Sequence, residues 1–266
     1  MKIGISTASL YPMHTEDALL TVAKLGIKNV EIFLNSVGEA SPEGKIFSSM
    51  QDTIKHYGLN LLALHPFSSP LETLFLFSSY DRRVDEIMEL YKRYFEAMSA
   101  LGAGTGAGGG IFVVHGAIAS AKCPNERYIE RLSRLIRAGR EAGVTVAQEN
   151  VSYCRSGDIA FLEMLARELG DSAAFVLDIK QARRSGASPL EMLDSLGDKI
   201  VHLHLSDSND TADCLPIGAG GFDFAELFAR LKERGYKGDA VVELYRENYG
   251  DYSALADCVA RLEKSL

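Results

Sequence analysis

Residues 174–206, AFVLDIKQARRSGASPLEMLDSLGDKIVHLHLS, contain the pattern that decides the fold. A β-rich run at Ala174–Asp178 and a second one at Ile200–Ser206 enclose a longer polar and apolar segment. Within that segment, Ser188–Glu191 (SPLE) has a capping serine, a proline at the first helical position and a glutamate three residues after the serine, which together mark a helix start. The stretch therefore predicts a strand, a helix and a second strand.

The same alternation of a short β-rich run with a longer helical pattern repeats from one end of the chain to the other. In residues 84–101, for example, apolar side chains recur at steps of three or four, as they do on one face of a helix. A second capping pattern marks a helix start at Asp223–Glu226. The predicted strands are Lys2–Ser6, Asn29–Leu34, Leu59–His65, Ile111–His115, Val144–Glu149, Ala174–Asp178, Ile200–Ser206 and Asp239–Leu244.

Eight strand and helix units in 266 residues predict an α/β fold. A (β/α)8 TIM barrel takes about 250 residues, so we predict a single TIM-barrel domain over residues 1–266. A doubly wound open sheet is the alternative, because strand order cannot be read from one sequence. The glycine-rich segment Gly104–Gly109 matches G-x-G-x-x-G, but it follows a helix and precedes a strand, whereas dinucleotide binding needs the reverse order. We predict a connection on the non-catalytic face there.

Composition and charge narrow the classes of partner. The chain has 28 basic and 36 acidic side chains and a formal charge of −8, which disfavours a nucleic-acid partner. Apolar residues make up 47%, as in an ordinary globular protein, and no apolar run reaches the length of a membrane span. The start of the chain does not have the pattern of a signal peptide. The four cysteines, Cys123, Cys154, Cys214 and Cys258, have no C-x-x-C spacing, so we expect free thiols and a cytoplasmic location.

Ionisable side chains end six of the predicted strands. Alternate residues of a barrel strand face the interior, and the residues that share the inward track with these side chains are mostly apolar. The six are His65, His115, Glu149, Asp178, His204 and Glu243. They stand at the carboxyl ends of the strands, where barrel enzymes keep their chemistry.

A divalent cation would stabilise such a group. One histidine or glutamate at a strand end is usually a surface residue, but several charges that converge on one dry site repel each other or suffer desolvation unless a cation compensates. The predicted ligands are Glu149, Asp178, His204 and Glu243. Three carboxylates and one imidazole suit manganese, cobalt, magnesium or zinc, and we expect one ion per chain. For His202, one layer deeper, we expect a supporting role, whereas Glu31 fits an inward position or a structural salt bridge equally well.

The order of the motifs along the chain resembles the xylose isomerase-like barrel superfamily, which includes sugar isomerases and epimerases, inosose-processing enzymes and AP endonucleases. The motifs are Val30-Glu31-Ile32, Ala63-Leu64-His65, Val114-His115-Gly116, Gln148-Glu149-Asn150, Leu177-Asp178, His202-Leu203-His204-Leu205-Ser206-Asp207, Pro216-Ile217-Gly218-Ala219-Gly220 and Val242-Glu243-Leu244. The resemblance implies a barrel with one divalent metal ion, held by the residues that match the four predicted ligands.

Several positions depart from the patterns of particular branches of this superfamily. Gln181, Ala212 and Cys214 stand where the endonuclease branch has further zinc ligands, so the trinuclear zinc site of that branch is incomplete. Arg155 and Asp210 stand where epimerases of free ketohexoses have a glutamate and an arginine. The resemblance therefore does not identify the substrate.

These observations predict a divalent-metal-dependent isomerase or epimerase of a small sugar, keto-polyol or sugar phosphate. Glu149 and Glu243 are the predicted catalytic pair that removes and returns a proton. The predicted substrate-binding residues are His65, His115, Lys180, Gln181 and Arg246, with Arg155 and Arg183 as further candidates for an acidic substituent. The alternatives are a zinc nuclease of the AP-endonuclease type and a non-catalytic sugar-binding barrel. We expect a small sugar-like partner and no nucleic acid or membrane, and a homo-oligomer is compatible with the sequence.

Overall fold

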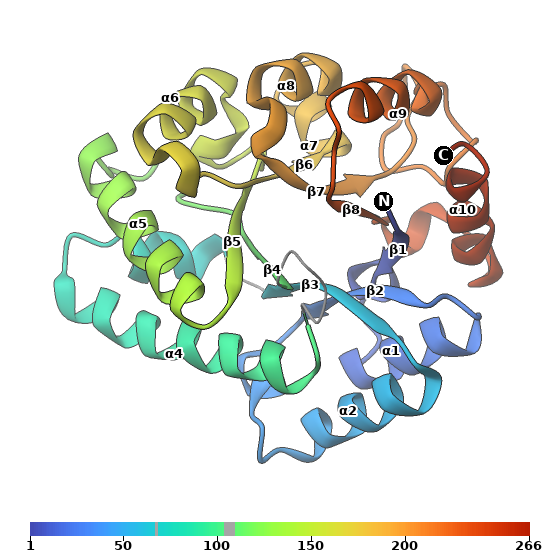
Figure 1. Cartoon of the computed structure of the whole chain (residues 1–266), viewed down its shortest axis with the longest axis horizontal. Helices are drawn as coiled ribbons and strands as arrows, with labels where there is room; N and C mark the ends of the chain where they lie inside the picture. Colours follow the sequence, from blue (N-terminus) through green and yellow to red (C-terminus); the bar gives the residue numbers. More distant parts are fainter. Residues whose placement is uncertain (67–68, 104–109) are drawn as a thin grey trace.

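Eight parallel strands close into a barrel in the computed structural model, which describes residues 1–66, 69–103 and 110–266. Each strand pairs with the next one along the chain, and β8 pairs with β1, so that the red end of the chain closes onto the blue end in Figure 1. The strands are β1 Ile3–Ser6, β2 Asn29–Leu34, β3 Asn60–Pro66, β4 Gly110–Val114, β5 Val144–Glu149, β6 Phe175–Asp178, β7 Ile200–Leu205 and β8 Asp239–Val242. The closed order confirms the predicted TIM barrel and not the open sheet.

A ring of helices surrounds the barrel (Figure 1), and each long helix follows one strand. The long helices are α1 Thr15–Lys24, α2 Lys45–Tyr57, α4 Asp81–Ala100, α5 Asn125–Glu141, α6 Ile159–Leu169, α8 Pro189–Leu196, α9 Phe224–Glu233 and α10 Ser253–Glu263. Two short helices, α3 Ser69–Leu71 and α7 Ile179–Arg184, come soon after β3 and directly after β6. The connections also contain one π-helical turn, Glu72–Leu76, and the 3-10 turns Thr7–Leu10, Val37–Ala40, Arg155–Gly157, Gly170–Ser172, Gly197–Lys199 and Arg246–Asn248.

The two helix starts predicted from capping patterns are both present. Ser188 and Glu191 form a capping box at the start of α8, with Pro189 at the first helical position. The Asp223 side chain accepts a hydrogen bond of 2.9 Å from the backbone N–H of Glu226 at the start of α9. Each cap satisfies backbone N–H groups that have no partner within the helix.

The apolar core has two parts, one inside the barrel and one between the strands and the helices. The residues inside the barrel are Ala63, Val113, Ala147, Ala174 and Val176, with Ile111 and Val201 packed against them. Six of these residues occupy strand positions that were predicted to face the barrel interior, and Val201 is adjacent to the inward-facing His202. This apolar interior supports the strand ends from below.

Three further expectations concern the rest of the chain. The four cysteines are free thiols, as predicted, and all four are buried. Within the described residues, no helix is both long enough and apolar enough to cross a membrane. The segment Gly104–Gly109, for which we predicted a connection between a helix and a strand, lies outside the described residues.

Candidate functional site

The six ionisable strand-end residues gather at the carboxyl ends of β3 to β8. Asp178 on β6 lies opposite His204 on β7, and Glu149 ends the neighbouring β5. Four of the six side chains have at most 3% of their surface exposed, whereas His115 has 15% and Glu243 14%. The site is therefore nearly dry, and His115 and Glu243 form its approach from solvent.

One nitrogen of His204 faces all three carboxylates. Its Nδ1 lies 3.4 Å from Glu149 Oε1, 3.5 Å from Glu243 Oε2 and 3.9 Å from Asp178 Oδ2. Ligand atoms that share one ion through bonds of about 2.1 Å stand about 3.4 Å apart in a tetrahedral site. Among the described residues, neither His204 Nδ1 nor Asp178 Oδ2 has a hydrogen-bond partner. These buried groups could therefore bind a metal ion.

Asp178 is held so that only one of its oxygens faces the cluster. Its Oδ1 accepts a hydrogen bond of 3.0 Å from the backbone N–H of Gln181 and so caps α7. Asn150 accepts a hydrogen bond from the backbone N–H of Asp178 and donates one to its carbonyl, at 2.7 and 3.0 Å. With Oδ1 and the backbone occupied, Oδ2 is the oxygen that faces the cluster, where Lys180 Nζ lies 3.2 Å from it.

Glu149 divides its two oxygens between different partners. Oε1 faces His204, whereas Oε2 lies 3.2 Å from His65 Nε2 and 3.1 Å from His115 Nε2. The two imidazoles lie against each other, with 2.8 Å between their Nε2 atoms. On its other side, His115 Nδ1 contacts the Ser69 hydroxyl. Glu149 therefore links the possible metal ligands to a pair of histidines.

Glu243 has a similar division, with a lysine in place of the histidines. Its Oε1 accepts a hydrogen bond of 2.9 Å from Lys180 Nζ, which also lies 3.2 Å from Asp178 Oδ2. Lys180 is buried, and its ammonium group lies 5.0 Å from the centre of the Tyr245 ring. The predicted substrate-binding lysine thus contacts two predicted metal ligands.

Burial and the neighbouring positive charges have opposite effects on the pKa values of the three carboxyl groups. Burial alone would raise the pKa of Glu149, but the charges of His204 and His115 hold it well below its usual range. Burial likewise favours a higher pKa for Glu243, and the charges of Lys180 and His204 lower it. Burial raises the pKa of Asp178 to about 6, against the opposing charge of Lys180. The site thus keeps two glutamates ionised at neutral pH.

The other predicted substrate-binding residues have partners elsewhere. Gln181 Oε1 accepts hydrogen bonds from the backbone N–H and the hydroxyl of Ser152, at 3.1 and 2.8 Å. Arg246 lies on the rings of Tyr249 and Tyr252 and donates a hydrogen bond to the Tyr249 carbonyl.

The two further arginine candidates are also engaged away from the cluster. Arg155 lies 4.2 Å from the centre of the Phe161 ring and donates a hydrogen bond to the carbonyl of Cys123. Arg183 donates to the carbonyl of Asn209 at 2.9 Å. The structure therefore brings neither guanidinium group to the strand-end cluster.

Several residues of the site were not singled out from the sequence. Asn150 is adjacent to Glu149 in one of the quoted motifs, so its position was a usable signal. Ser69 and Tyr153, whose hydroxyls are 3.0 Å apart, lie in connections after β3 and β5, for which strand parity gives no information. Glu31, for which two positions were open, is fully buried and faces both His202 and His204. The Glu31 side chain points into the barrel, and its carboxylate contacts both imidazoles.

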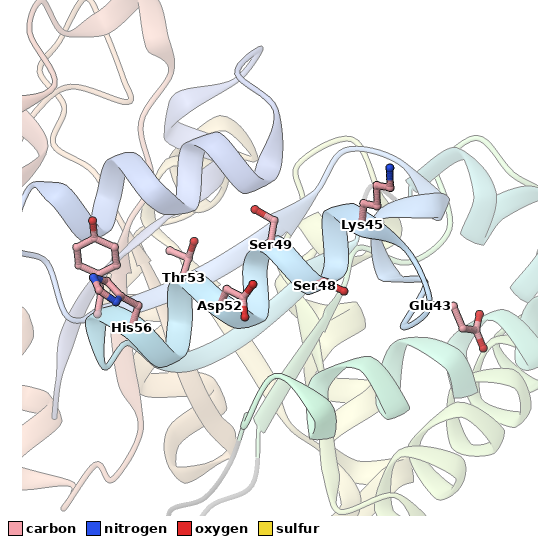
Figure 2. A pocket seen from close by; sticks show the side chains of 8 residues that line it. Glu43, Lys45, Ser48, Ser49, Asp52, Thr53 and His56 are labelled. Carbon is pink, nitrogen blue, oxygen red and sulfur yellow. The ribbon is translucent and has the colours of Figure 1, made fainter.

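A shallow hollow of about 550 Å³ lies along the outer face of α2, away from the strand ends. Figure 2 shows that its polar side chains, such as Lys45, Asp52 and His56, point in different directions along the helix. Nothing in this arrangement directs several polar groups at one point. The strand-end cluster remains the candidate site.

Comparison with known proteins places this barrel in a family. The family model described as xylose isomerase-like TIM barrel matches residues 19–263. This chain belongs to the xylose isomerase-like TIM barrel family. A fructoselysine 3-epimerase of Shigella flexneri is 24% identical over 258 residues, which cover 92% of this chain and 90% of that protein.

Two solved structures in the comparison have the same fold. The D-allulose 3-epimerase from Methylomonas sp. has a TM-score of 0.79 at 18% identity and covers 100% of this chain and 98% of its own. The structure of an IolI protein with a bound zinc atom has a TM-score of 0.76 at 20% identity and covers 100% and 96%. The predicted family and fold are therefore confirmed.

Three residues of this xylose isomerase-like barrel differ from the zinc ligands of the endonuclease branch, and they are poor zinc ligands. They are Gln181, Ala212 and Cys214. Ala212 has no donor atom in its side chain, and Gln181 is bonded to Ser152. Burial raises the pKa of the Cys214 thiol to about 12, so this thiol is neutral at physiological pH. A thiol binds zinc as the thiolate, so it would first have to lose its proton.

We expect the affinity of this xylose isomerase-like barrel for a divalent ion to rise with pH. Burial would lower the pKa of His204, but Glu31, Glu243 and Glu149 raise it well above its usual value, while that of Asp178 is about 6. Both groups must lose a proton to bind an ion, so protons compete with the ion at low pH. Titration calorimetry with Mn²⁺ from about pH 5.5 to about pH 8, in buffers of different ionisation enthalpy, would measure affinity and proton release. An affinity independent of pH would contradict this prediction.

Proposed function

We propose that this protein is a divalent-metal-dependent isomerase or epimerase that acts on a small sugar, keto-polyol or sugar phosphate. One observation carries the proposal. Two glutamates from separate parts of the barrel, Glu149 at the end of β5 and Glu243 directly after β8, each direct one oxygen at His204 Nδ1 and keep the second oxygen for a cationic or hydrogen-bonding partner. Inversion at carbon requires one carboxylate that removes a proton and one carboxylic acid that returns a proton, so one of the two glutamates must first take up a proton from solvent.

Glu149, Asp178, His204 and Glu243 would hold the metal ion. Their three carboxylates and one imidazole are hard or borderline donors that suit Mn²⁺, Co²⁺, Mg²⁺ or Zn²⁺. When bound, such an ion polarises a carbonyl and a neighbouring hydroxyl of the substrate and so makes the C–H bond between them more acidic. The chain itself provides the proton acceptor and the proton donor.

The second oxygens of the glutamates are the atoms that would handle the substrate proton. Glu149 Oε2 lies within hydrogen-bond distance of the imidazoles of His65 and His115, and Glu243 Oε1 accepts a hydrogen bond from Lys180. In the proposed reaction one ionised glutamate removes the proton from one face of the substrate and becomes protonated, while the other, which has taken up a proton from solvent beforehand, returns it to the opposite face and is left ionised. His65, His115 and Lys180 would orient these oxygens and donate hydrogen bonds to substrate oxygens.

One observation favours the alternative of a zinc nuclease. His65, His115 and Glu149 form a second trio whose donor atoms lie within 4.8 Å of one another, which is suitable for a further ion. The formal charge of −8 opposes this alternative, since neutralising phosphates with lysine and arginine dominates affinity for DNA. Gln181, Ala212 and Cys214 oppose it as well, because a third ion would lack good ligands.

The proposal is tested with a panel of ketoses, keto-polyols and their phosphates in deuterated water, with each of the four metal ions added in turn. We expect the protein to exchange one carbon-bound proton of at least one compound, detected by NMR. Glu39→Gln should exchange this proton as the wild type does. It is the matched control for variants of Glu149 and Glu243, because Glu39 is a buried carboxylate bonded to Thr15 and Asn35, outside the cluster. Tight binding without exchange would instead support a sugar-binding barrel, and cleavage of DNA at abasic sites would support the nuclease.

A further inference from the structure

Glu31 is a charged residue in the interior of the barrel, on β2. Its side chain has 0% of its surface exposed, and Oε2 lies 3.1 Å from His204 Nε2 and 3.3 Å from His202 Nε2. Burying a carboxylate is costly unless hydrogen bonds and opposite charges compensate. An apolar side chain would serve the packing of the barrel at lower cost. The position of Glu31 therefore calls for an explanation beyond packing.

His204 lies between Glu31 and the possible metal ligands. Its two ring nitrogens face opposite partners, with Nε2 toward Glu31 and Nδ1 toward Glu149, Asp178 and Glu243. A neutral imidazole has one N–H and one free lone pair. A carboxylate at Nε2 selects the tautomer with the proton on Nε2, which leaves the lone pair on Nδ1 for an ion.

We propose that Glu31 is a positioning residue of the metal centre, which holds His204 in the tautomer and ring orientation that make Nδ1 a metal ligand. His202 supports Glu31 from the deeper layer of the barrel, with its ring perpendicular to that of His204 and 5.5 Å away. Glu31 itself contacts no substrate in this role. The inference rests on the proposed function, because it requires that His204 bind an ion.

The same three residues could in principle hold a second ion. Their donor atoms lie within 4.8 Å of one another, and His202 lines a cavity of about 820 Å³ that extends to the first residues of several strands. Such an ion would occupy His204 Nε2, while the first ion occupies Nδ1. His204 would then have to lose both ring protons. A neutral imidazole that donates to Glu31 is the less costly arrangement, and the number of bound ions distinguishes the two.

Glu31→Gln keeps the shape of the side chain and removes its charge, and Glu39→Gln is the control for the loss of a buried carboxylate. We expect Glu31→Gln to weaken Mn²⁺ or Zn²⁺ binding about 10- to 100-fold, as observed when partners of ligating histidines are removed. Glu39→Gln should bind the ion as the wild type does. Thermal unfolding of both variants without metal separates this effect from a general loss of stability.

A second measurement needs only the wild-type protein. In zinc-loaded protein labelled with ¹⁵N at histidine, we expect NMR to show the His204 proton on Nε2 and the metal on Nδ1. Metal on Nε2, or equal affinities of wild type and Glu31→Gln, would overturn the inference while the proposed metal centre stands. Two ions per chain, with one lost in Glu31→Gln, would overturn it in favour of a second site. A wild-type chain that binds no ion would overturn both this inference and the proposed function.

Discussion

Replacement of Asp178 or His204 by alanine is expected to abolish tight binding of a divalent ion. Each substitution removes one of four proposed ligands from a site in which the remaining groups are held by their own partners, such as Lys180 at Glu243. The barrel should stay folded, because the core below the site is apolar apart from Glu31 and His202. Asp178→Ala also removes the cap of α7, which costs about 1 kcal/mol of stability. Metal analysis of protein purified without chelator, with circular dichroism to check folding, measures both effects.

His204→Ala is expected to cost more stability than Asp178→Ala, since it leaves Glu31 with one fewer partner in the barrel interior. Asp213→Ala is the control, because Asp213 is a carboxylate paired with Arg184 outside the cluster. It should leave the metal content at the wild-type value, close to one equivalent per chain. If both site variants also kept that content, the metal centre would lie elsewhere.

Glutamine at Glu149 or Glu243 is expected to reduce turnover of the substrate found by screening about 10²- to 10⁴-fold, the range that general acid–base catalysis contributes. Glutamine keeps the shape of the side chain and removes its ability to take up a proton. Because each carboxylate is proposed to serve one face of the substrate, one single variant could still exchange the substrate proton with deuterated water without completing the inversion. The double variant should do neither. NMR of substrate and product measures exchange and inversion in the same sample.

Metal occupancy has to be measured in each of these variants, because both glutamates are also proposed ligands. Glu39→Gln again provides a control with normal occupancy and normal turnover. If Glu149→Gln and Glu243→Gln both kept the metal and near-normal turnover, the mechanism with two carboxylates would be wrong. The base would then have to be His65, His115 or Lys180.

The fold could be predicted from the sequence because several independent patterns indicated the same strands and helices. Strand runs, helix periodicity and the caps at Ser188 and Asp223 all indicated the same elements, and strand parity placed Asp178 and His204 on one face. Neighbouring strands bring such residues together through backbone register alone, as in the pair Asp178 and His204. This part of the site needed no knowledge of side-chain conformation.

The remaining part of the site depended on information that a linear pattern does not contain. Lys180 lies in α7, and only the conformation of its long side chain places the ammonium group between Asp178 and Glu243. Glu31 meets His204 across the barrel, from strands that are not neighbours, so the contact exists only when the barrel is closed. The contact between Gln181 and Ser152 likewise depends on how two connections fold.

The position of Lys180 bears on whether the chain folds before or after it would bind an ion. Its ammonium group balances part of the charge of Asp178 and Glu243 before any ion arrives. Small zinc domains remain unfolded without their metal, because binding of the ion provides their folding free energy. This barrel has a buried ammonium group next to these carboxylates and a large apolar core, so the polypeptide can reach its native state without an ion, and the proposed ion would bind afterwards. Under the proposed function, an ion would then enter a preformed site, and it could leave again without unfolding the chain.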